Sequence, residues 1–219
     1  MAMLSTAFDP VMLYVATTSS GKLRDFRVAA AVVSTRFRIE PLPDMRSLPI
    51  APEEGATFAA NASSKAEFYS AYARGKIVLA DDSGLEVDAL NGQPGVRSAR
   101  FALDANFRPD LPVDVANNLL LLERMQSIPV VQRTARYRCA LAAARDGKTL
   151  AWAEGVVAGE ILQSPRGTGG FGYDPLFFLP ELARTMAEVD LETKHTLSHR
   201  GHALRILIST IKHPAPSKI

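Results

Sequence analysis

The chain has 219 residues, of which 47% are hydrophobic and 22% are charged, and its formal net charge is +2. These values suit one soluble domain, 1–219, with a sizeable core, whose first ten residues and last seven (213–219) we expect to be loose ends. With no basic stripe, no apolar run long enough for a bilayer and a single cysteine (Cys139), we expect no nucleic acid, no membrane, no internal disulfide and a cytoplasmic location.

The predicted elements alternate between strands and helices along the chain. Residues 11–17 form an apolar, β-branched run that predicts a buried strand, and a helix is expected over about 21–34. The pattern then predicts a strand at 37–42, a Pro-rich loop, a helix at 57–75, a strand at 76–82, a Gly/Pro-rich loop at 84–100 and a helix at about 113–127. Residues 132–162 predict a long hairpin that turns at Asp146-Gly147, before a strand at 176–179 and a last helix at 197–212. Because the hairpin requires antiparallel pairing, we expect an α/β fold with a mixed sheet.

The stretch TTSSGK, residues 17–22, lies between the first strand and the first helix. It is not a Walker loop, because Ala16 and Leu23 stand where that motif requires a glycine and a hydroxyl residue. Ser19 or Ser20 can still cap the helix, and a helix N-terminus after a strand binds anions, with Lys22 adding a full charge. The alternative is an ordinary capped helix with a solvated lysine.

An acidic pair follows the strand at 76–82. Asp81, Asp82 and Ser83 are expected at the carboxyl end of that strand, where α/β proteins bind ligands. Their hard oxygen atoms suit Mg²⁺ held together with substrate phosphates. The alternative is an acidic turn, since Asp, Ser and Gly all favour turns.

A glycine-rich loop over 164–178 carries Phe171, Tyr173 and Asp174. It contains a formal G-x-G-x-x-G, but no strand leads into it and Pro175 prevents a helix from following, so a dinucleotide site is rejected. Aromatic side chains on such a loop can stack on a flat base, although a core-facing loop would also explain them.

Two further clusters lie near predicted helix starts. Ser198 is a natural N-cap of the last helix, which would place His199 and Arg200 in its first turn, facing a ligand or only solvent. In the earlier helix Asn61 and Lys65 share one face. The preceding Glu53-Glu54 either reaches a metal or is merely solvated, and Trp152 is expected with Cys139 on the packed face of the hairpin.

Three of these blocks together resemble the inosine triphosphate pyrophosphatase family, also called dITP/XTP pyrophosphatases. The blocks are ADDSGLEVDALNGQPGVRSARFA, GTGGFGYDPLFF and SHRGHAL, and the resemblance extends from about residue 11 to 212. It implies a long mixed β-sheet with flanking helices that form two lobes and an active site in the cleft between them. It also implies Mg²⁺-dependent hydrolysis of deaminated purine nucleoside triphosphates to a monophosphate and pyrophosphate, by a protein that is usually a homodimer.

The resemblance assigns a role to each matching residue. Asp82 becomes the general base and a magnesium ligand, with Glu53, or else Glu54, as the second metal ligand. The substrate-binding set is Thr17, Thr18, Ser19, Ser20, Gly21 and Lys22 for the triphosphate, Lys65, Ser83 and Lys194, then Phe171, Gly172, Tyr173 and Asp174 at the base and sugar, and His199 and Arg200 as base readers.

The sequence departs from the family pattern at three places. Ser19 stands where asparagine is usual, the Glu53-Glu54-Gly55 segment is one residue shorter than usual, and Ala60 replaces a glutamate. Two other functions are compatible with the same pocket: a pyrophosphatase with another base preference, and a nucleotide sensor without hydrolysis.

Overall fold

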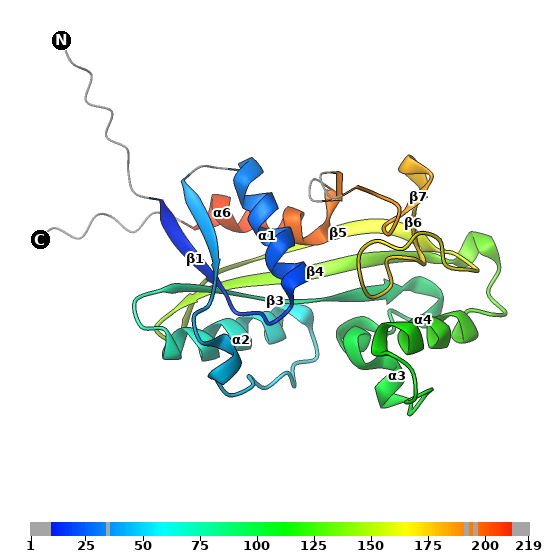
Figure 1. Cartoon of the computed structure of the whole chain (residues 1–219), viewed down its shortest axis with the longest axis horizontal. Helices are drawn as coiled ribbons and strands as arrows, with labels where there is room; N and C mark the ends of the chain where they lie inside the picture. Colours follow the sequence, from blue (N-terminus) through cyan, green and yellow to red (C-terminus); the bar gives the residue numbers. More distant parts are fainter. Residues whose placement is uncertain (1–9, 34–35, 191–192, 195–196, 212–219) are drawn as a thin grey trace, which may run out of the picture.

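The computed structural model describes residues 10–33, 36–190, 193–194 and 197–211. Within these residues the strands form one open mixed sheet in the order β2-β1-β3-β4-β5-β6-β7 (Figure 1). β1 pairs in parallel with β2 and β3, and every later pair, from β3–β4 to β6–β7, is antiparallel. The strands are β1 Val11–Val15, β2 Phe37–Pro41, β3 Ile77–Val87, β4 Thr134–Arg145, β5 Lys148–Ile161, β6 Phe177–Leu179 and β7 Arg184–Thr185. The predicted mixed sheet is therefore confirmed.

Helices cover both faces of this sheet (Figure 1). α1 (Ser20–Val33) and α6 (His199–Thr210) lie on one face, and α2 (Phe58–Tyr72) lies on the other, with α3 (Phe101–Asp104) and α4 (Val113–Arg124) toward the far end. Side chains of a strand alternate between faces, so Ile77 and Leu79 pack with α1 and α6, whereas Val78 and Ala80 pack with α2. Burial on both faces explains why β3 begins as a continuous apolar run.

The long hairpin turns where the sequence predicts. Asp146 and Gly147 join β4 to β5 with φ of 51° and 77°, which is the left-handed conformation that a tight hairpin turn requires. Beneath α2, β4 presents the alanines Ala140, Ala142 and Ala144, and all three are fully buried. These small side chains let α2 lie close to the sheet.

Hydrophobic side chains gather toward the two ends of the sheet. At one end, two clusters join β1, β2, α1, α2 and α6 to the sheet, and they include Phe26 and Phe58. At the other end, two clusters join α3, α4, β6 and the end of β3, and they include Leu121 and Phe177. The polar site described below lies between these two ends.

Two expectations about β3 and the loop after it are wrong. The strand does not end at Asp82 but continues to Val87, because it pairs with β4 along its whole length. Asp81 and Asp82 therefore lie in mid-strand, and part of the expected loop 84–100 is strand followed by the 3₁₀ helices η2 (Asp88–Leu90) and η3 (Gly95–Arg100). Gly84 permits this packing, because a Cβ there would lie 2.5 Å from the carbonyl oxygen of Gly95 in η3.

The hairpin brings a further correction. Cys139 is fully buried as expected, but the Trp152 side chain is 52% exposed, because it points to the face of β5 opposite to α6. The expected loose ends lie outside the described residues, apart from Pro10.

Candidate active site

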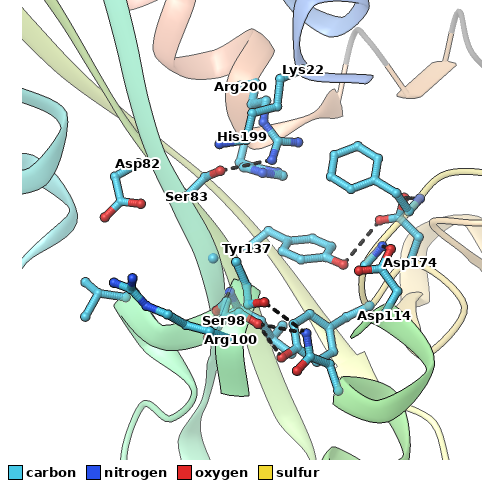
Figure 2. Close-up of a pocket in the computed structure, with 18 of the residues that line it drawn as sticks. Lys22, Asp82, Ser83, Ser98, Arg100, Asp114, Tyr137, Asp174, His199 and Arg200 are labelled. Carbon is cyan, nitrogen blue, oxygen red and sulfur yellow. Dashed lines mark hydrogen bonds between the residues drawn. The ribbon is translucent and has the colours of Figure 1, made fainter. Parts of the chain in front are cut away.

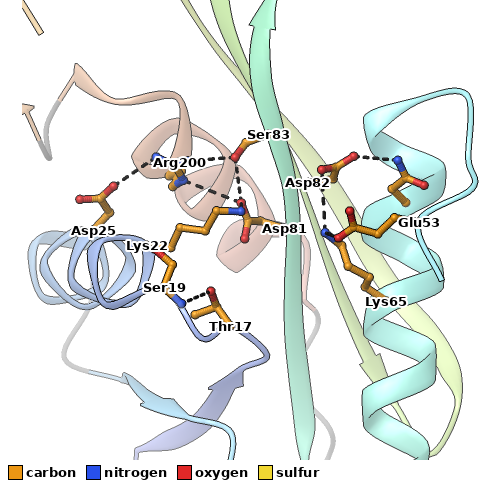
Figure 3. Close-up of polar contacts among 11 residues, drawn as sticks. Thr17, Ser19, Lys22, Asp25, Glu53, Lys65, Asp81, Asp82, Ser83 and Arg200 are labelled. Atoms are coloured by element: carbon orange, nitrogen blue, oxygen red, sulfur yellow. Dashed lines mark hydrogen bonds and ion pairs between the residues drawn. The ribbon is translucent and has the colours of Figure 1, made fainter. Parts of the chain in front are cut away.

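The centre of the site is the mid-strand pair Asp81-Asp82, whose side chains point to opposite faces of the sheet (Figure 3). Successive residues of a strand alternate in this way. Asp81 therefore faces α1 and α6, where it meets Lys22 and Arg200. Asp82 faces α2, where it meets Asn61 and Lys65. One strand thus builds two different carboxylate environments side by side.

On the α1/α6 face the polar groups form a closed network around Asp81. Lys22 Nζ lies 2.8 Å from Asp81 Oδ2, and the Ser83 hydroxyl donates to the same oxygen at 3.0 Å. Arg200 donates from Nη2 to Ser83 Oγ at 2.9 Å and from Nη1 to Asp25 Oδ2 at 3.3 Å. Arg200 Nε lies 3.8 Å from Asp81 Oδ2, beyond hydrogen-bonding distance. The guanidinium therefore ties α6 to β3 and α1.

The TTSSGK stretch forms the turn that presents Lys22 to this network. Ser19 Oγ accepts from the backbone N–H of Lys22 at 3.3 Å and so caps α1, while Thr17 Oγ1 accepts from the Ser19 N–H at 3.1 Å. Thr18 and Ser20 are exposed at the turn. Gly21 lies against the Phe171 ring, since a Cβ there would be 3.0 Å from Phe171 Cε1. Lys22 is thus held by a carboxylate rather than merely solvated.

On the α2 face Asp82 is held by Asn61, for which the sequence predicted a place on a helix face but no role. Asn61, 2% exposed, donates from Nδ2 to Asp82 Oδ2 at 2.9 Å and accepts from the Gly55 N–H at 2.7 Å. Lys65, one turn later, lies 3.8 Å from Asp82 Oδ1 and 2.8 Å from Glu53 Oε1. The sequence did contain a signal for this role: Asn61 lies four residues before Lys65, and residues at that spacing share one face of a helix.

The two carboxylates of the pair differ in acidity. Burial on its own would raise the pKa of Asp81, but the positive charges of Lys22 and Arg200 hold that pKa far below its usual value. Burial raises the pKa of Asp82, and the opposing effects of Lys65 and the Asn61 hydrogen bond do not cancel it. A pair of carboxyl groups with pKa values pushed apart is the arrangement expected when one is a fixed charge and the other exchanges a proton.

At the other end of the site the glycine-rich loop meets β4 and α6. Asp174, 5% exposed, accepts from Lys194 Nζ at 2.5 Å, from the Tyr137 hydroxyl at 3.2 Å and from the Phe171 N–H at 2.9 Å. Tyr137 also stacks on His199, with ring centroids 4.9 Å apart (Figure 2). Tyr137 was missed, because nothing in the sequence distinguishes it from the other inward residues of the hairpin.

Helix α4 supplies two residues that the sequence analysis also missed. Asp114 accepts from the Gly172 N–H at 2.8 Å, and Asn118 donates to the Gly172 carbonyl oxygen at 2.9 Å. The two side chains lie four residues apart on one helical face and hold the two peptide groups that flank the Gly172 Cα. The loop between Phe171 and Asp174 is therefore held by α4 at Gly172 and by Tyr137 and Lys194 at Asp174.

One cavity of about 230 Å³ joins these parts. Lys22, Lys65, Glu53, Asp82 and Arg100 line its charged end, and Tyr137, Phe171, Tyr173, Asp174 and His199 line its aromatic end. In Figure 2 Asp82 and Arg100 lie on one side of the cavity, and Asp174 and Asp114 lie on the other. A cavity with cations and carboxylates at one end and flat rings at the other suits a nucleotide, with its phosphates and base at opposite ends.

Most of the predicted site residues are brought together here. Ser83, Gly172 and Arg200 also line the cavity, and Lys194 reaches it through Asp174. Of the TTSSGK stretch only Lys22 lines it, whereas Thr17, Thr18, Ser19, Ser20 and Gly21 do not. Both candidate metal ligands are exposed, but Glu53 lines the cavity and pairs with Lys65, whereas Glu54 does not line it. Glu53 is therefore the better placed.

The carboxylate oxygens of the cavity fit a magnesium ion that takes only one or two ligands from the protein. No group of three or more ligating side chains gathers in the part of the chain that the structure describes. Mg²⁺ commonly takes one or two carboxylates and completes its shell with water and substrate phosphates. Asp82 and Glu53, which meet through Lys65, match that donor set.

Comparisons with known proteins agree with this geometry. The Ham1 family model matches residues 13–210. A dITP/XTP pyrophosphatase of Acidobacterium capsulatum is 59% identical over 91% of this chain and 97% of its own, and one of Geobacter sulfurreducens is 47% identical over 89% and 94%. The solved Ham1 protein of Staphylococcus aureus superposes with a TM-score of 0.74 at 36% identity, over 90% of this chain and 96% of its own. The predicted family and fold are confirmed: the chain belongs to the Ham1 family.

Proposed function

We propose that this protein hydrolyses deaminated purine nucleoside triphosphates (ITP, dITP and XTP) to the monophosphate and pyrophosphate, with Mg²⁺, and so cleanses the nucleotide pool. The enzyme class is nucleoside triphosphate pyrophosphatase, the name that its relatives carry. We also propose that it acts as a cytoplasmic homodimer. Among the described residues no helix is both long and apolar enough to cross a bilayer. The observation that carries the proposal is a cavity that has a charged end and an aromatic end.

The charged end suits hydrolysis of a phosphoanhydride. Lys22 and Lys65 neutralise and position the phosphates, and Asp82, with its raised pKa, takes the proton of the attacking water. The oxygen of that water bonds to the α phosphorus while the bond from this phosphorus to the bridging oxygen breaks. The β and γ phosphates leave together as pyrophosphate. A magnesium ion held by Asp82 and Glu53 would supply further neutralisation of the phosphate charge.

The aromatic end suits a purine with a 6-oxo group. His199 is 5% exposed, and its Nδ1 has no hydrogen-bond partner among the described residues. Burial, reinforced by the charge of Arg200, lowers the pKa of His199 well below its usual value, so the ring is neutral at pH 7 and can donate one hydrogen bond. Phe171 lies at the same end and can stack on the base.

The decisive experiment measures pyrophosphate release from ITP, XTP, GTP, ATP and dUTP at one Mg²⁺ concentration. We expect release from ITP and XTP at rates well above those with ATP and dUTP. Guanine also has a 6-oxo group, so the GTP rate reports on contacts at the 2-position. A preference for dUTP would favour a pyrophosphatase of another base class, and binding without release would favour a nucleotide sensor.

A further inference from the structure

One cation of the cavity has no role in the function proposed above. Arg100 is the last residue of η3, and its side chain, which is 35% exposed, lines the charged end of the cavity. Ser98 fixes η3 against β3, because its hydroxyl oxygen accepts from the Leu85 N–H at 2.9 Å, and the same hydroxyl donates to the Gly95 carbonyl within η3 at 2.6 Å. The backbone that carries Arg100 is therefore rigidly placed.

The Arg100 side chain lies on the same side of the cavity as Asp82 (Figure 2). Its Nη2 lies 3.5 Å from the Glu53 carbonyl oxygen and 3.8 Å from Glu53 Oε2. Glu53 Oε1 is already paired with Lys65 at 2.8 Å. Arg100 thus stands at the edge of an ion-pair chain that leads through Glu53 and Lys65 to Asp82.

The other cations of the site are held more closely. Each has a carboxylate oxygen or hydroxyl within 2.9 Å, and these cations are Lys22, Lys65, Lys194 and Arg200. The contacts of Arg100 are long and its side chain is the most exposed of the five. Arg100 can therefore turn to a new anion at little cost, because no short hydrogen bond has to break.

We propose that Arg100 binds the terminal phosphates of the substrate, and the pyrophosphate that leaves, at the charged end of the cavity. The proposal rests on the proposed function, because it takes the aromatic end as the base site. Arg100 lies on the far side of the cavity from Asp174, so a nucleotide with its base at the aromatic end brings its terminal phosphates toward Arg100. A planar guanidinium matches two phosphate oxygens with parallel hydrogen bonds, which an ammonium cannot do.

Binding of inorganic pyrophosphate to metal-free protein tests the proposal by titration calorimetry, without any turnover. We expect Arg100→Ala to weaken pyrophosphate binding roughly 10- to 100-fold, as for loss of a charge-assisted hydrogen bond, and Arg100→Lys to recover part of it. Binding of inosine monophosphate should change less than twofold. The matched control is Arg97→Ala in the same η3, since Arg97 pairs with Asp104 at 2.6 Å and does not line the cavity. This control should bind pyrophosphate as the unmodified protein does.

A second variant, Glu53→Gln, distinguishes two roles of Arg100. In one role Arg100 binds phosphate directly, and in the other it only holds Glu53 in place. Without metal, removal of the Glu53 charge should leave pyrophosphate binding equal or tighter, the opposite of the effect of Arg100→Ala. The proposal is overturned if pyrophosphate fails to bind the unmodified protein, if Arg100→Ala binds it normally, if pyrophosphate and monophosphate weaken alike, or if Glu53→Gln reproduces the loss. Pyrophosphate release from ITP by the unmodified protein tests the proposed function separately.

Discussion

Replacement of Arg200 by alanine should lower the stability of the folded protein as well as its activity. Arg200 is 6% exposed and bonds to Asp25 and Ser83, with its Nε 3.8 Å from Asp81. Together with Lys22, the two aspartates and Arg200 carry a formal net charge of zero. Without the guanidinium the same buried groups carry −1, and the hydroxyl of Ser83 loses a charged donor.

The magnitude follows from the burial of these groups. Loss of one partner from a buried ion pair costs about 3–5 kcal/mol, and we expect the lower end, about 3 kcal/mol, because Lys22 still pairs with Asp81 at 2.8 Å. For a chain of this length that loss lowers the melting temperature by roughly 6–12 °C. Urea unfolding at pH 7, followed by circular dichroism, measures it directly.

A matched exposed pair provides the control. Arg27 lies 2.6 Å from Glu40, but both side chains are nearly half exposed, so Arg27→Ala should cost about 0–1 kcal/mol. If Arg200→Ala and Arg27→Ala lose the same stability, the reasoning from burial is refuted.

The same Arg200 variant also tests the predicted role of Arg200 as a base reader. That role predicts a larger fall in kcat/KM for ITP than for ATP, toward a ratio of one, with partial recovery in Arg200→Lys. Unfolding alone removes active protein and so lowers both rates equally. A constant ITP/ATP ratio would contradict the base-reader role and leave Arg200 as a residue that holds α6 against β3.

Three further changes have expected outcomes. Asp82→Asn should lower turnover of ITP by roughly two to four orders of magnitude in a folded protein, and near-normal turnover would remove Asp82 from catalysis. Glu53→Gln should raise the Mg²⁺ concentration for half-maximal rate about tenfold or more, while Glu54→Gln should not, and the reverse order would make Glu54 the ligand. Gly155→Ala should lower the free energy of unfolding in urea by about 1–3 kcal/mol, because the new Cβ would overlap the His199 carbonyl oxygen of α6. It should also lower ITP turnover. Unchanged stability would show that α6 can shift freely.

The sequence by itself determined the order and type of most elements. The hairpin turn at Asp146-Gly147 and the cap at Ser198, which accepts from the Gly201 N–H at 3.0 Å, are local features. Their residues favour one backbone conformation whatever surrounds them, so a pattern a few residues long is sufficient. The three motif blocks identified the family in the same way, because each is contiguous in the chain.

Other features depend on partners distant in sequence. β3 continues past Asp82 because β4, which is distant in the chain, supplies backbone partners as far as Val87, which pairs with Ala135. Trp152 is exposed because α2 covers only part of its face of β5, on which Val156 is exposed too, whereas α6 buries Ala153 on the other face. Neither outcome could be read from the local pattern, which was equally consistent with a strand that ends at the acidic pair and with a buried tryptophan.

Only the tertiary structure decided how the site residues are arranged. The sequence placed Asp81 and Asp82 side by side, but the fold sends one to Lys22 and Arg200 and the other to Asn61 and Lys65. The physical reason is that a carboxylate takes its pKa and its role from the charges and burial around it. Those surroundings come from α1, α2 and α6, which are distant in the chain and meet only when both faces of the sheet are covered.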